Sequence, residues 1–252
     1  MKNVTQLNLD LRFNGISSQG AYFISQALKD MRYIDQISLN LQYCQISDKG
    51  IFYICETLEQ IKNLTQLTLI VSSNEISAQG AQYISKSLQD MKNLNQLELN
   101  LSFNQISEIG AQNLSQALKQ MKKASFLSLN LEYTQINHKG AQFIGQALQE
   151  MKNVKQLNIN LSDNIISSQG AYELSTSLKQ MQNVTHLTLE LGTNQISDQG
   201  VQYICQFLKE MKNVSNLTLT FSNNTVFDNG AEYISQLLEE INNVKQLSLK
   251  LK

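Results

Sequence analysis

The stretch Met151–Gln180, MKNVKQLNINLSDNIISSQGAYELSTSLKQ, is one complete copy of a unit that repeats along the whole chain. Written in rows of thirty residues from Met1, the sequence falls into register eight times without an insertion or a deletion, and a half-row, Ile241–Lys252, follows. Glycine stands at position 20 of every complete row, from Gly20 to Gly230. Self-similarity at a period of about 20–50 residues indicates stacked structural repeats, so this period decides the fold.

Within each row the spacing of the apolar residues changes once. Leu157, Ile159 and Leu161 alternate with polar residues, which is typical of a half-buried strand. From Ala171 to Met181 the apolar residues instead recur every three or four positions, as they do along one face of a helix. Each row is therefore predicted to form a strand followed by a helix over row positions 18–31. The first strand is expected at Val4–Leu11 and the last at Lys245–Lys252.

Other recurrent residues are predicted to serve the turns. Ser167 precedes the helical stripe and is expected to be its N-cap, while Asn153 and its equivalents follow the helix, where a left-handed residue would end it. The recurrent glycine is expected to prevent a clash with the neighbouring strand-to-helix loop. An asparagine at position 14, replaced twice by other small residues, is expected to bond to backbone groups of the turn. This column comprises Asn14, Cys44, Asn74, Asn104, Thr134, Asn164, Asn194 and Asn224.

The run Leu99-Asn100-Leu101-Ser102-Phe103-Asn104-Gln105-Ile106, followed by Gly110, has the pattern LxLxxNxI. This pattern resembles a leucine-rich repeat of the ribonuclease-inhibitor-like type, in which a full helix follows every strand. One departure is that the opening leucine of the family's repeat falls at glutamine, as at Gln96, so two extra residues are expected to lengthen the strand. The composition, rich in glutamine and asparagine and free of proline, resembles leucine-rich-repeat proteins of ciliate protists.

Stacking such repeats predicts a curved shape. Parallel strands are ~4.8 Å apart, whereas the axes of packed helices are ~8–10 Å apart, so the stack bends with the sheet inside. The resulting fold class is α/β, a right-handed leucine-rich-repeat solenoid or horseshoe with a concave parallel sheet of about nine strands and convex helices. We expect one domain over 1–252, with eight repeats in 1–240 and a half-repeat in 241–252. Glutamines at position 6 are expected to form a stacked amide ladder.

Composition limits the classes of partner and the compartment. A net charge of −1 and a pI of about 6.1 give no basic surface for nucleic acid. No apolar run approaches the ~20 residues of a membrane span. The three cysteines form no disulfide framework, and Cys55 and Cys205 occupy a slot on the inward side of the helix that is mostly serine. These features, with a strand predicted from Val4 and hence no signal peptide, favour an intracellular, cytoplasmic location.

No constellation for chemistry is apparent in the sequence. The two histidines, His138 and His186, belong to different repeats and different faces. No spacing of cysteine or histidine suits a zinc site, and no glycine-rich loop suits a phosphate. We therefore predict that the protein is not an enzyme, with no catalytic residues, no metal and no cofactor.

The candidate contact residues lie on the outward side of the predicted sheet, where most side chains are small and polar. Large aromatic side chains stand at the edge of the sheet, and acidic ones make its middle attractive to a basic partner. The alternative is that the edge aromatics tuck into the turn beside the asparagine. The candidates are Phe13, Tyr43, Glu98, Phe103, Phe126, Glu132, Tyr133, Asp163 and Glu190.

A curved repeat protein presents a large preformed surface, so we predict a non-catalytic scaffold that binds a protein partner on the concave face or at the open ends. The last strand lacks a covering helix, which predicts self-association or docking at this uncapped C-terminal strand. The alternative function is a GTPase-activating regulator resembling the Ran GTPase-activating protein, which shares this repeat type. No residue here matches the arginine or asparagine loop or the acidic tail of that family, and the chain ends in lysines.

Overall fold

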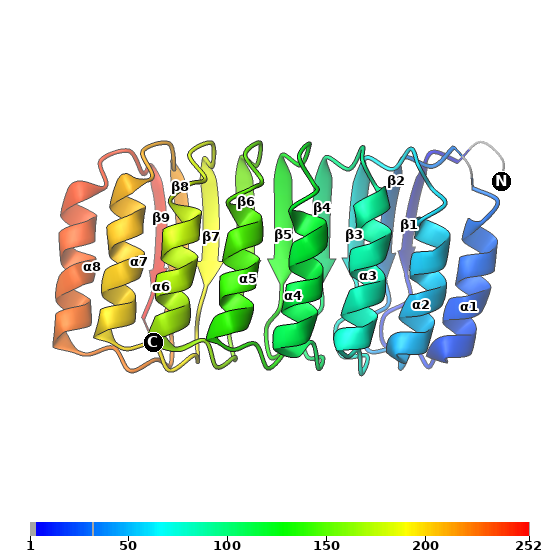
Figure 1. The fold of residues 1–252 in the computed structure, drawn as a ribbon, viewed down its shortest axis with the longest axis horizontal. Helices are drawn as coiled ribbons and strands as arrows, with labels where there is room; N and C mark the ends of the chain where they lie inside the picture. The colour runs from blue at the N-terminus through cyan, green and yellow to red at the C-terminus, as the bar shows by residue number, and fades with distance from the viewer. Residues whose placement is uncertain (1–3, 32, 252) are drawn as a thin grey trace.

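The structure, a computed structural model, describes residues 4–31 and 33–251. Within these ranges nine strands alternate with eight helices (Figure 1). The strands are β1 (Gln6–Asp10), β2 (Gln36–Asn40), β3 (Gln66–Ile70), β4 (Gln96–Asn100), β5 (Phe126–Asn130), β6 (Gln156–Asn160), β7 (His186–Glu190), β8 (Asn216–Thr220) and β9 (Gln246–Lys250). The helices are α1 (Ser17–Leu28), α2 (Ser47–Leu58), α3 (Ala78–Asp90), α4 (Ser107–Leu118), α5 (His138–Leu148), α6 (Ser167–Leu178), α7 (Asp198–Glu210) and α8 (Asp228–Glu240).

All nine strands belong to one parallel sheet in the order of the sequence, from β1 to β9. Residues thirty apart pair in every case, as Gln6 pairs with Gln36 and Leu97 with Leu127. In Figure 1 the strands point downward and each strand lies further left than the one before, with the helices in front, so the crossovers are right-handed. The sheet is open, and equivalent residues of neighbouring repeats stand side by side.

The helices lie on the convex side of the sheet, as predicted. The row of eight helices is longer than the row of nine strands in Figure 1. This difference is expected because packed helices need more lateral space than hydrogen-bonded strands. The sheet therefore lines the concave side, and the predicted α/β leucine-rich-repeat solenoid is confirmed. That residues 1–252 form a single domain stays a prediction.

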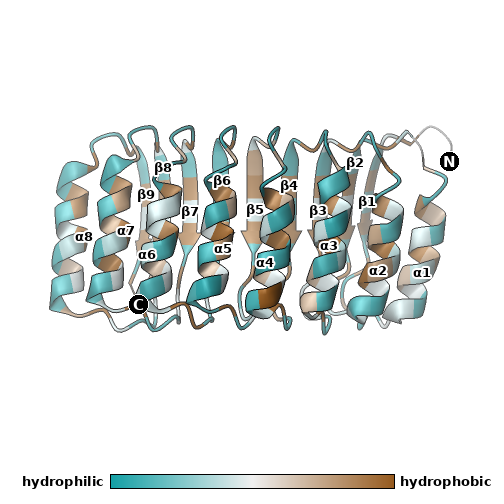
Figure 2. Cartoon of the chain, in the orientation of Figure 1, coloured by the Kyte–Doolittle hydropathy of each residue, from teal (hydrophilic) through white to brown (hydrophobic). Residues whose placement is uncertain are grey.

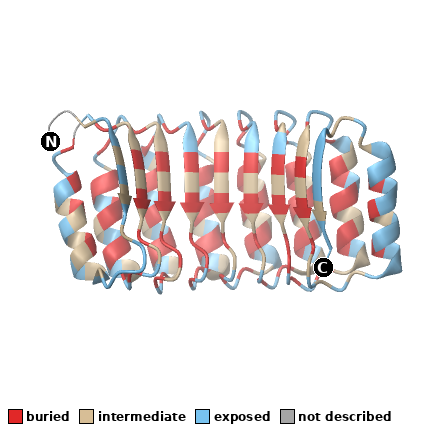
Figure 3. Ribbon diagram, turned by 180° about the vertical axis from the view of Figure 1, so that it is seen from behind, coloured by how far each residue is buried: buried red, intermediate tan, exposed pale blue. Residues whose placement is uncertain are grey.

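The core lies between the sheet and the helices. Leu97 and Leu99 of β4 are buried, whereas Glu98 between them is only partly buried. Figure 3 shows this alternation along the inner strands and the greater exposure of β1 and β9. Leu114 and Leu118 cover the sheet from α4, and Figure 2 shows hydrophilic residues on the outer sides of the helices. Burying each such leucine stabilises the fold by ~1.5–3 kcal/mol.

The strands are shorter than predicted. Each has five residues, so β1 is Gln6–Asp10 and not Val4–Leu11. The third leucine of each triplet lies beyond the strand, yet Leu101 is fully buried and its N–H donates to the Asn130 carbonyl at 2.9 Å. The core and the lateral hydrogen bonds therefore continue past the strand into the turn.

Two predictions about helix ends are wrong. Ser167 is the first residue of α6 with φ of 60°, and the N-cap position before it is occupied by Ile166, which makes no side-chain cap hydrogen bond. Capping by the equivalent Ser77 does occur, because its hydroxyl accepts from Gln79 N at 3.1 Å. The backbone of Asn153 does not have a positive φ, and α5 already ends at Leu148, five residues earlier. The Asn153 side chain instead donates to the Lys122 carbonyl of the preceding repeat at 2.6 Å.

The asparagine column has the predicted role. The amide of Asn104 is almost completely buried and bonds to backbone groups of its own turn and of the preceding one. Its Oδ1 accepts from the N–H groups of Asn74 (3.1 Å) and Ile76 (2.9 Å), and its Nδ2 donates to the carbonyls of Val71 (3.0 Å), Leu101 (3.0 Å) and Ser102 (3.1 Å). One side chain thus joins two repeats where the chain leaves the sheet.

The recurrent glycine lies close to the neighbouring helix, and not to the neighbouring strand-to-helix loop as predicted. A Cβ at Gly110, in the first turn of α4, would lie 2.5 Å from Cγ2 of Ile106 and 3.2 Å from Cβ of Ala81. Ala81 belongs to the first turn of α3. The glycine therefore allows close packing of adjacent helices and not the passage of a loop.

The glutamine column at position 6 stacks in register, but it forms no continuous amide ladder. Across the part of the chain that the structure describes, hydrogen bonding between side chains of neighbouring strands in this column is confined to Asn216 and Gln246. At the C-terminal end, Leu247 is 43% and Leu251 is 41% exposed. Lys252, expected at the end of the last strand, lies outside the described residues.

Candidate functional site

Position 13 of each repeat forms a column along one edge of the sheet, in the turn that follows the strand; we call it the edge strip. Every member has a left-handed backbone, with φ between 51° and 59°. Each N–H from Phe13 to Thr193 donates to the next repeat, as Tyr43 N does to the Ser72 carbonyl at 3.0 Å. The edge strip is therefore held rigidly by backbone bonds. Its members are Phe13, Tyr43, Ser73, Phe103, Tyr133, Asp163, Thr193 and Asn223.

The four aromatic residues of the edge strip point into solvent. Phe13, Tyr43, Phe103 and Tyr133 are 50–65% exposed. The rings of Phe13 and Tyr43 lie 6.0 Å apart, and those of Phe103 and Tyr133 stack at 5.5 Å with an interplanar angle of 23°. The alternative that they tuck into the turn is wrong. The side chains of the asparagine column already occupy the turn and form hydrogen bonds with its backbone groups.

A cavity of about 390 Å³ interrupts the aromatic run at Ser73. Tyr43 and Phe103 line it from the repeats on either side, and Glu75 contributes a carboxylate. This volume is in the lower part of the ~300–1,000 Å³ range of small-ligand pockets. We call this cavity the Ser73 slot, and it could admit one side chain of a partner.

Three of the predicted acidic residues, Glu132, Asp163 and Glu190, lie near the Tyr133 end of the aromatic run, and the last two affect the pKa of Glu132. Burial raises the pKa of Glu132 above its ordinary value, and the negative charges of Asp163 and Glu190 raise it further. A hydrogen bond from Asn160 Nδ2 to Glu132, at 3.2 Å, opposes this rise in pKa. Glu132 thus stands in a negative field next to Tyr133, and a cation there would relieve the repulsion.

Two predicted residues lie away from the edge strip. Phe126 is the first residue of β5, at the opposite end of the strand, where it pairs with Gln96 and Gln156. Glu98 lies in the middle of β4 and accepts a hydrogen bond from Thr68 at 3.3 Å. Both belong to the concave sheet, but neither lies beside the four aromatic residues of the edge strip.

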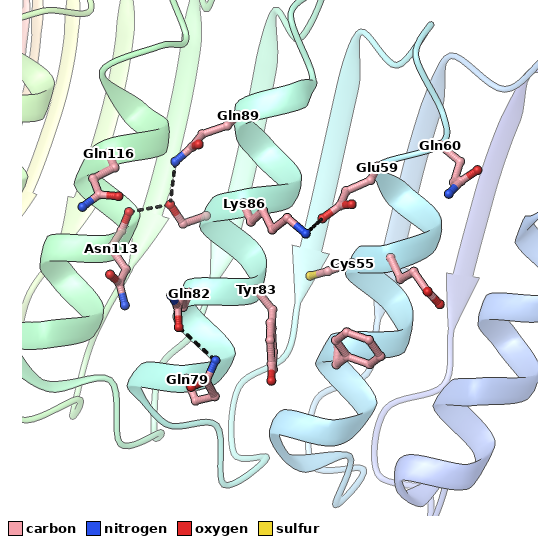
Figure 4. A pocket seen from close by; sticks show the side chains of 13 residues that line it. Cys55, Glu59, Gln60, Gln79, Gln82, Tyr83, Lys86, Gln89, Asn113 and Gln116 are labelled. Atoms are coloured by element: carbon pink, nitrogen blue, oxygen red, sulfur yellow. Dashed lines mark hydrogen bonds and ion pairs between the residues drawn. The ribbon is translucent and has the colours of Figure 1, made fainter.

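A larger cavity than the Ser73 slot, about 670 Å³, lies on the convex side across α2, α3 and α4, and the sequence did not predict it. Figure 4 shows Lys86 extending from α3 toward Glu59, the residue that follows α2, and the two charges lie 3.9 Å apart. Amide side chains such as Gln82 line much of the remainder. Burial raises the pKa of the Cys55 thiol, with the charge of Glu59 adding to the effect, so this cysteine is not an activated nucleophile. Glutamines also occur on the helices outside this groove, so the sequence contains no signal that singles it out.

Aromatic residues also meet between the convex helices. The rings of Tyr22 and Tyr53 lie 5.2 Å apart, as do those of Phe52 and Tyr83. Tyr53 and Tyr83 are partly buried, so these rings pack between neighbouring repeats. Phe23 and Phe52 are exposed, and the adjacent pairs in the sequence, such as Tyr22-Phe23, could have indicated this second cluster.

Groups that could support other chemistry are sparse in the described structure. No three histidine, cysteine, aspartate or glutamate side chains there are arranged to hold a metal ion. All three cysteines are free and buried, and burial raises the pKa of Cys205 to about 12 against a smaller lowering by Lys209. Among the helices of residues 4–31 and 33–251, none has both the length and the apolar character needed to cross a membrane.

Comparison with known proteins identifies the repeat. A family model described as leucine-rich repeat matches residues 7–25, 37–55, 97–115 and 184–205. A comparison with curated proteins found no match. Solved structures that resemble the chain include leiomodin-1 actin-binding site 2 (ABS2), with 18% sequence identity, a TM-score of 0.44 and coverage of 65% of this chain and 88% of that one. This likeness is too low to support a conclusion about function, and the ribonuclease-inhibitor-like type stays a prediction. The thirty-residue period, the strand–helix unit and the matched segments together show that the chain contains leucine-rich repeats.

Proposed function

We propose that this protein is a non-catalytic, intracellular scaffold that binds a protein partner along the edge strip and the adjoining acidic part of the concave face. The observation that carries the proposal is the exposure of four aromatic side chains at left-handed positions. The leucine-rich-repeat fold supports it, because such solenoids present an extended, preformed binding surface.

The structure of the turn does not account for these aromatic residues. A left-handed backbone disfavours bulky residues and tolerates asparagine and aspartate best. The chain itself uses Ser73, Asp163 and Asn223 at this position, with φ of 54–55°. Aromatic side chains there gain little from burial in the free protein. Aromatic side chains are, however, the anchors that protein interfaces favour, so contact with a partner explains their presence.

Charge supports a basic partner surface. Repulsion from the negative charges of Asp163 and Glu190 raises the pKa of Glu132, although burial is the larger cause. Positive groups of a partner would remove this repulsion and would be attracted from a distance. Association should therefore slow as salt is added, because the charges involved are partly exposed.

The test begins with a partner captured by the full chain and identified. The double variant Phe103→Asn/Tyr133→Asn should bind it at least ~10-fold more weakly by isothermal titration calorimetry, because two interface anchors of ~1–2 kcal/mol each are lost. Asparagine suits the left-handed backbone, so the fold should be retained. The matched variant Phe23→Asn/Phe52→Asn removes two exposed rings from the convex side and should bind normally. Equal affinities for both double variants would refute the proposed surface.

A pH dependence of stability follows from Glu132. Between its ordinary pKa and its raised one, the folded protein binds more protons than the unfolded chain, so the free energy of unfolding falls as pH rises through this window. We expect Glu132→Gln to abolish this contribution and to be more stable than the parent at neutral pH. Asp163→Asn should reduce the fall, because it removes one cause of the raised pKa. Urea midpoints across the acidic range measure the effect, and unchanged profiles in both variants would contradict it.

Two predictions from the sequence stay open. Exposure of Leu247 and Leu251 at β9 supports docking or self-association at the C-terminal strand, whereas the equivalent Leu97 and Leu101 are buried. No observation favours the alternative of a GTPase-activating regulator. A GTPase turnover assay with and without the protein would decide it.

A further inference from the structure

We propose that the Ser73 slot binds the guanidinium group of one arginine side chain in the partner protein, stacked between Tyr43 and Phe103. This inference rests on the proposed function, because it assigns the partner chemistry at one point of the edge strip.

The spacing of the repeats leaves room for one planar group. Rings of adjacent repeats in the edge strip lie 5.5–6.0 Å apart. Tyr43 and Phe103 are two repeats apart, so their rings should be separated by roughly twice that distance, about 11–12 Å, which allows a planar group between them at the ~4.5–7 Å typical of ring contacts. Tyr43 and Phe103 both line the cavity of about 390 Å³ at this point, which continues to Tyr133 of the next repeat.

The slot results from the size of one side chain and not from a change of backbone. Ser73 has φ of 55°, and its neighbours Tyr43 and Phe103 have φ of 56° and 55°. The Ser73 N–H donates to the Ser102 carbonyl at 3.0 Å, just as Tyr43 N donates to Ser72. A tyrosine at position 73 would therefore continue the aromatic column and fill the slot without disturbing the fold.

The charges around the slot favour arginine over a neutral ring or a lysine. Among the described residues that line it, Glu75 supplies a carboxylate, Gln45 and Gln105 supply amides, and no side chain is positive. A guanidinium group is planar, stacks on aromatic faces and donates to carboxylates in a fork. An ammonium group is not planar and cannot stack on the rings, and a neutral ring would make no ion pair with the exposed Glu75 carboxylate. The acidic field of Glu132 further along the edge strip adds attraction for a cation.

The experiment uses the full chain and three blocked peptides, acetyl-Gly-Arg-Gly-amide and its lysine and phenylalanine counterparts. Aromatic ring resonances of Tyr43 and Phe103 are followed by NMR during titration of each peptide. We expect saturable shifts with the arginine peptide and binding of the lysine peptide weaker on the order of tenfold, because only the first can stack on both rings. Glu75→Gln should weaken binding of the arginine peptide severalfold.

A filled slot provides the decisive variant. Ser73→Tyr should abolish the shifts of Tyr43 and Phe103 caused by the arginine peptide, whereas Asn223→Tyr adds the same ring at an equivalent left-handed position and should leave them unchanged. Equal binding of the arginine and lysine peptides, preference for phenylalanine, no saturable shift, or undiminished binding by Ser73→Tyr would each overturn the inference. If Phe103→Asn/Tyr133→Asn loses the partner while Ser73→Tyr keeps it, the edge strip is the binding surface and only the slot assignment is wrong.

Discussion

Replacing Asn104 by alanine is expected to lower the free energy of unfolding by roughly 3–5 kcal/mol. The variant loses the five hydrogen bonds of a side chain that is only 5% exposed. Each buried backbone group left without a partner costs ~1–3 kcal/mol, and water entering the space left by the amide would offset part of the sum. Because the lost bonds join two repeats, the effect should extend beyond one turn.

Urea denaturation measures this loss, and the chain offers two matched variants. Asn158→Ala changes a partly exposed asparagine of β6 and should stay within ~0.5 kcal/mol of the parent. Asn104→Thr should cost less than Asn104→Ala, because Thr134 occupies the same position naturally and donates to the Leu131 carbonyl at 2.5 Å. A midpoint for Asn104→Ala equal to that for Asn158→Ala would contradict the role assigned to the asparagine column.

The second large effect is expected for Gly110→Leu. Its Cβ would lie 2.5 Å from Ile106 Cγ2, 3.2 Å from Ala81 Cβ and 3.4 Å from Ala78 Cα, so the Ile106 side chain must shift and α3 must move slightly away from α4. Overpacking of this kind typically costs ~1–3 kcal/mol and sometimes more. The better helix propensity of leucine returns ~1 kcal/mol, so we expect a net destabilisation of up to about 2 kcal/mol.

Gly15→Leu is the matched control for this prediction. A Cβ at Gly15 meets no heavy atom within 4 Å, so leucine there should change stability little. Thermal unfolding followed by circular dichroism compares the two variants with the parent. An unchanged midpoint for Gly110→Leu would show that the glycine is dispensable and that close helix packing does not require it.

The sequence was sufficient to predict the register of the sheet. Repeats of one length, without insertions, must place residues thirty apart side by side, as the pairing of Leu97 with Leu127 confirms. The ends of the strands could not be predicted in the same way. Leu101 continues the alternation of Leu97 and Leu99, yet it lies beyond the end of β4. Alternating apolar residues look the same in the sequence whether the last one belongs to the strand or to a turn whose side chain enters the core.

The edge strip could be found only in part from the sequence. The aromatic residues are visible at position 13, but their exposure depends on the left-handed backbone, which hydrophobic spacing does not reveal. Phe126 was grouped with them because it is large, although position 6 is at the other end of the strand. The Ser73 slot could have been found by aligning the rows, since serine interrupts a run of rings at one position. The convex groove could not, because its glutamines resemble those of every other helix.

Site-specific photo-crosslinking tests the central claim, that the edge strip binds the partner, most directly. A photoreactive phenylalanine analogue replaces Tyr133 in one sample and the convex Phe23 in another, and each protein is irradiated with the identified partner. Both side chains are exposed in the free protein, so accessibility alone does not distinguish the two sites. We predict a crosslinked adduct from position 133, competed away by unlabelled parent protein, and none from position 23. An adduct from position 23 alone would contradict the account.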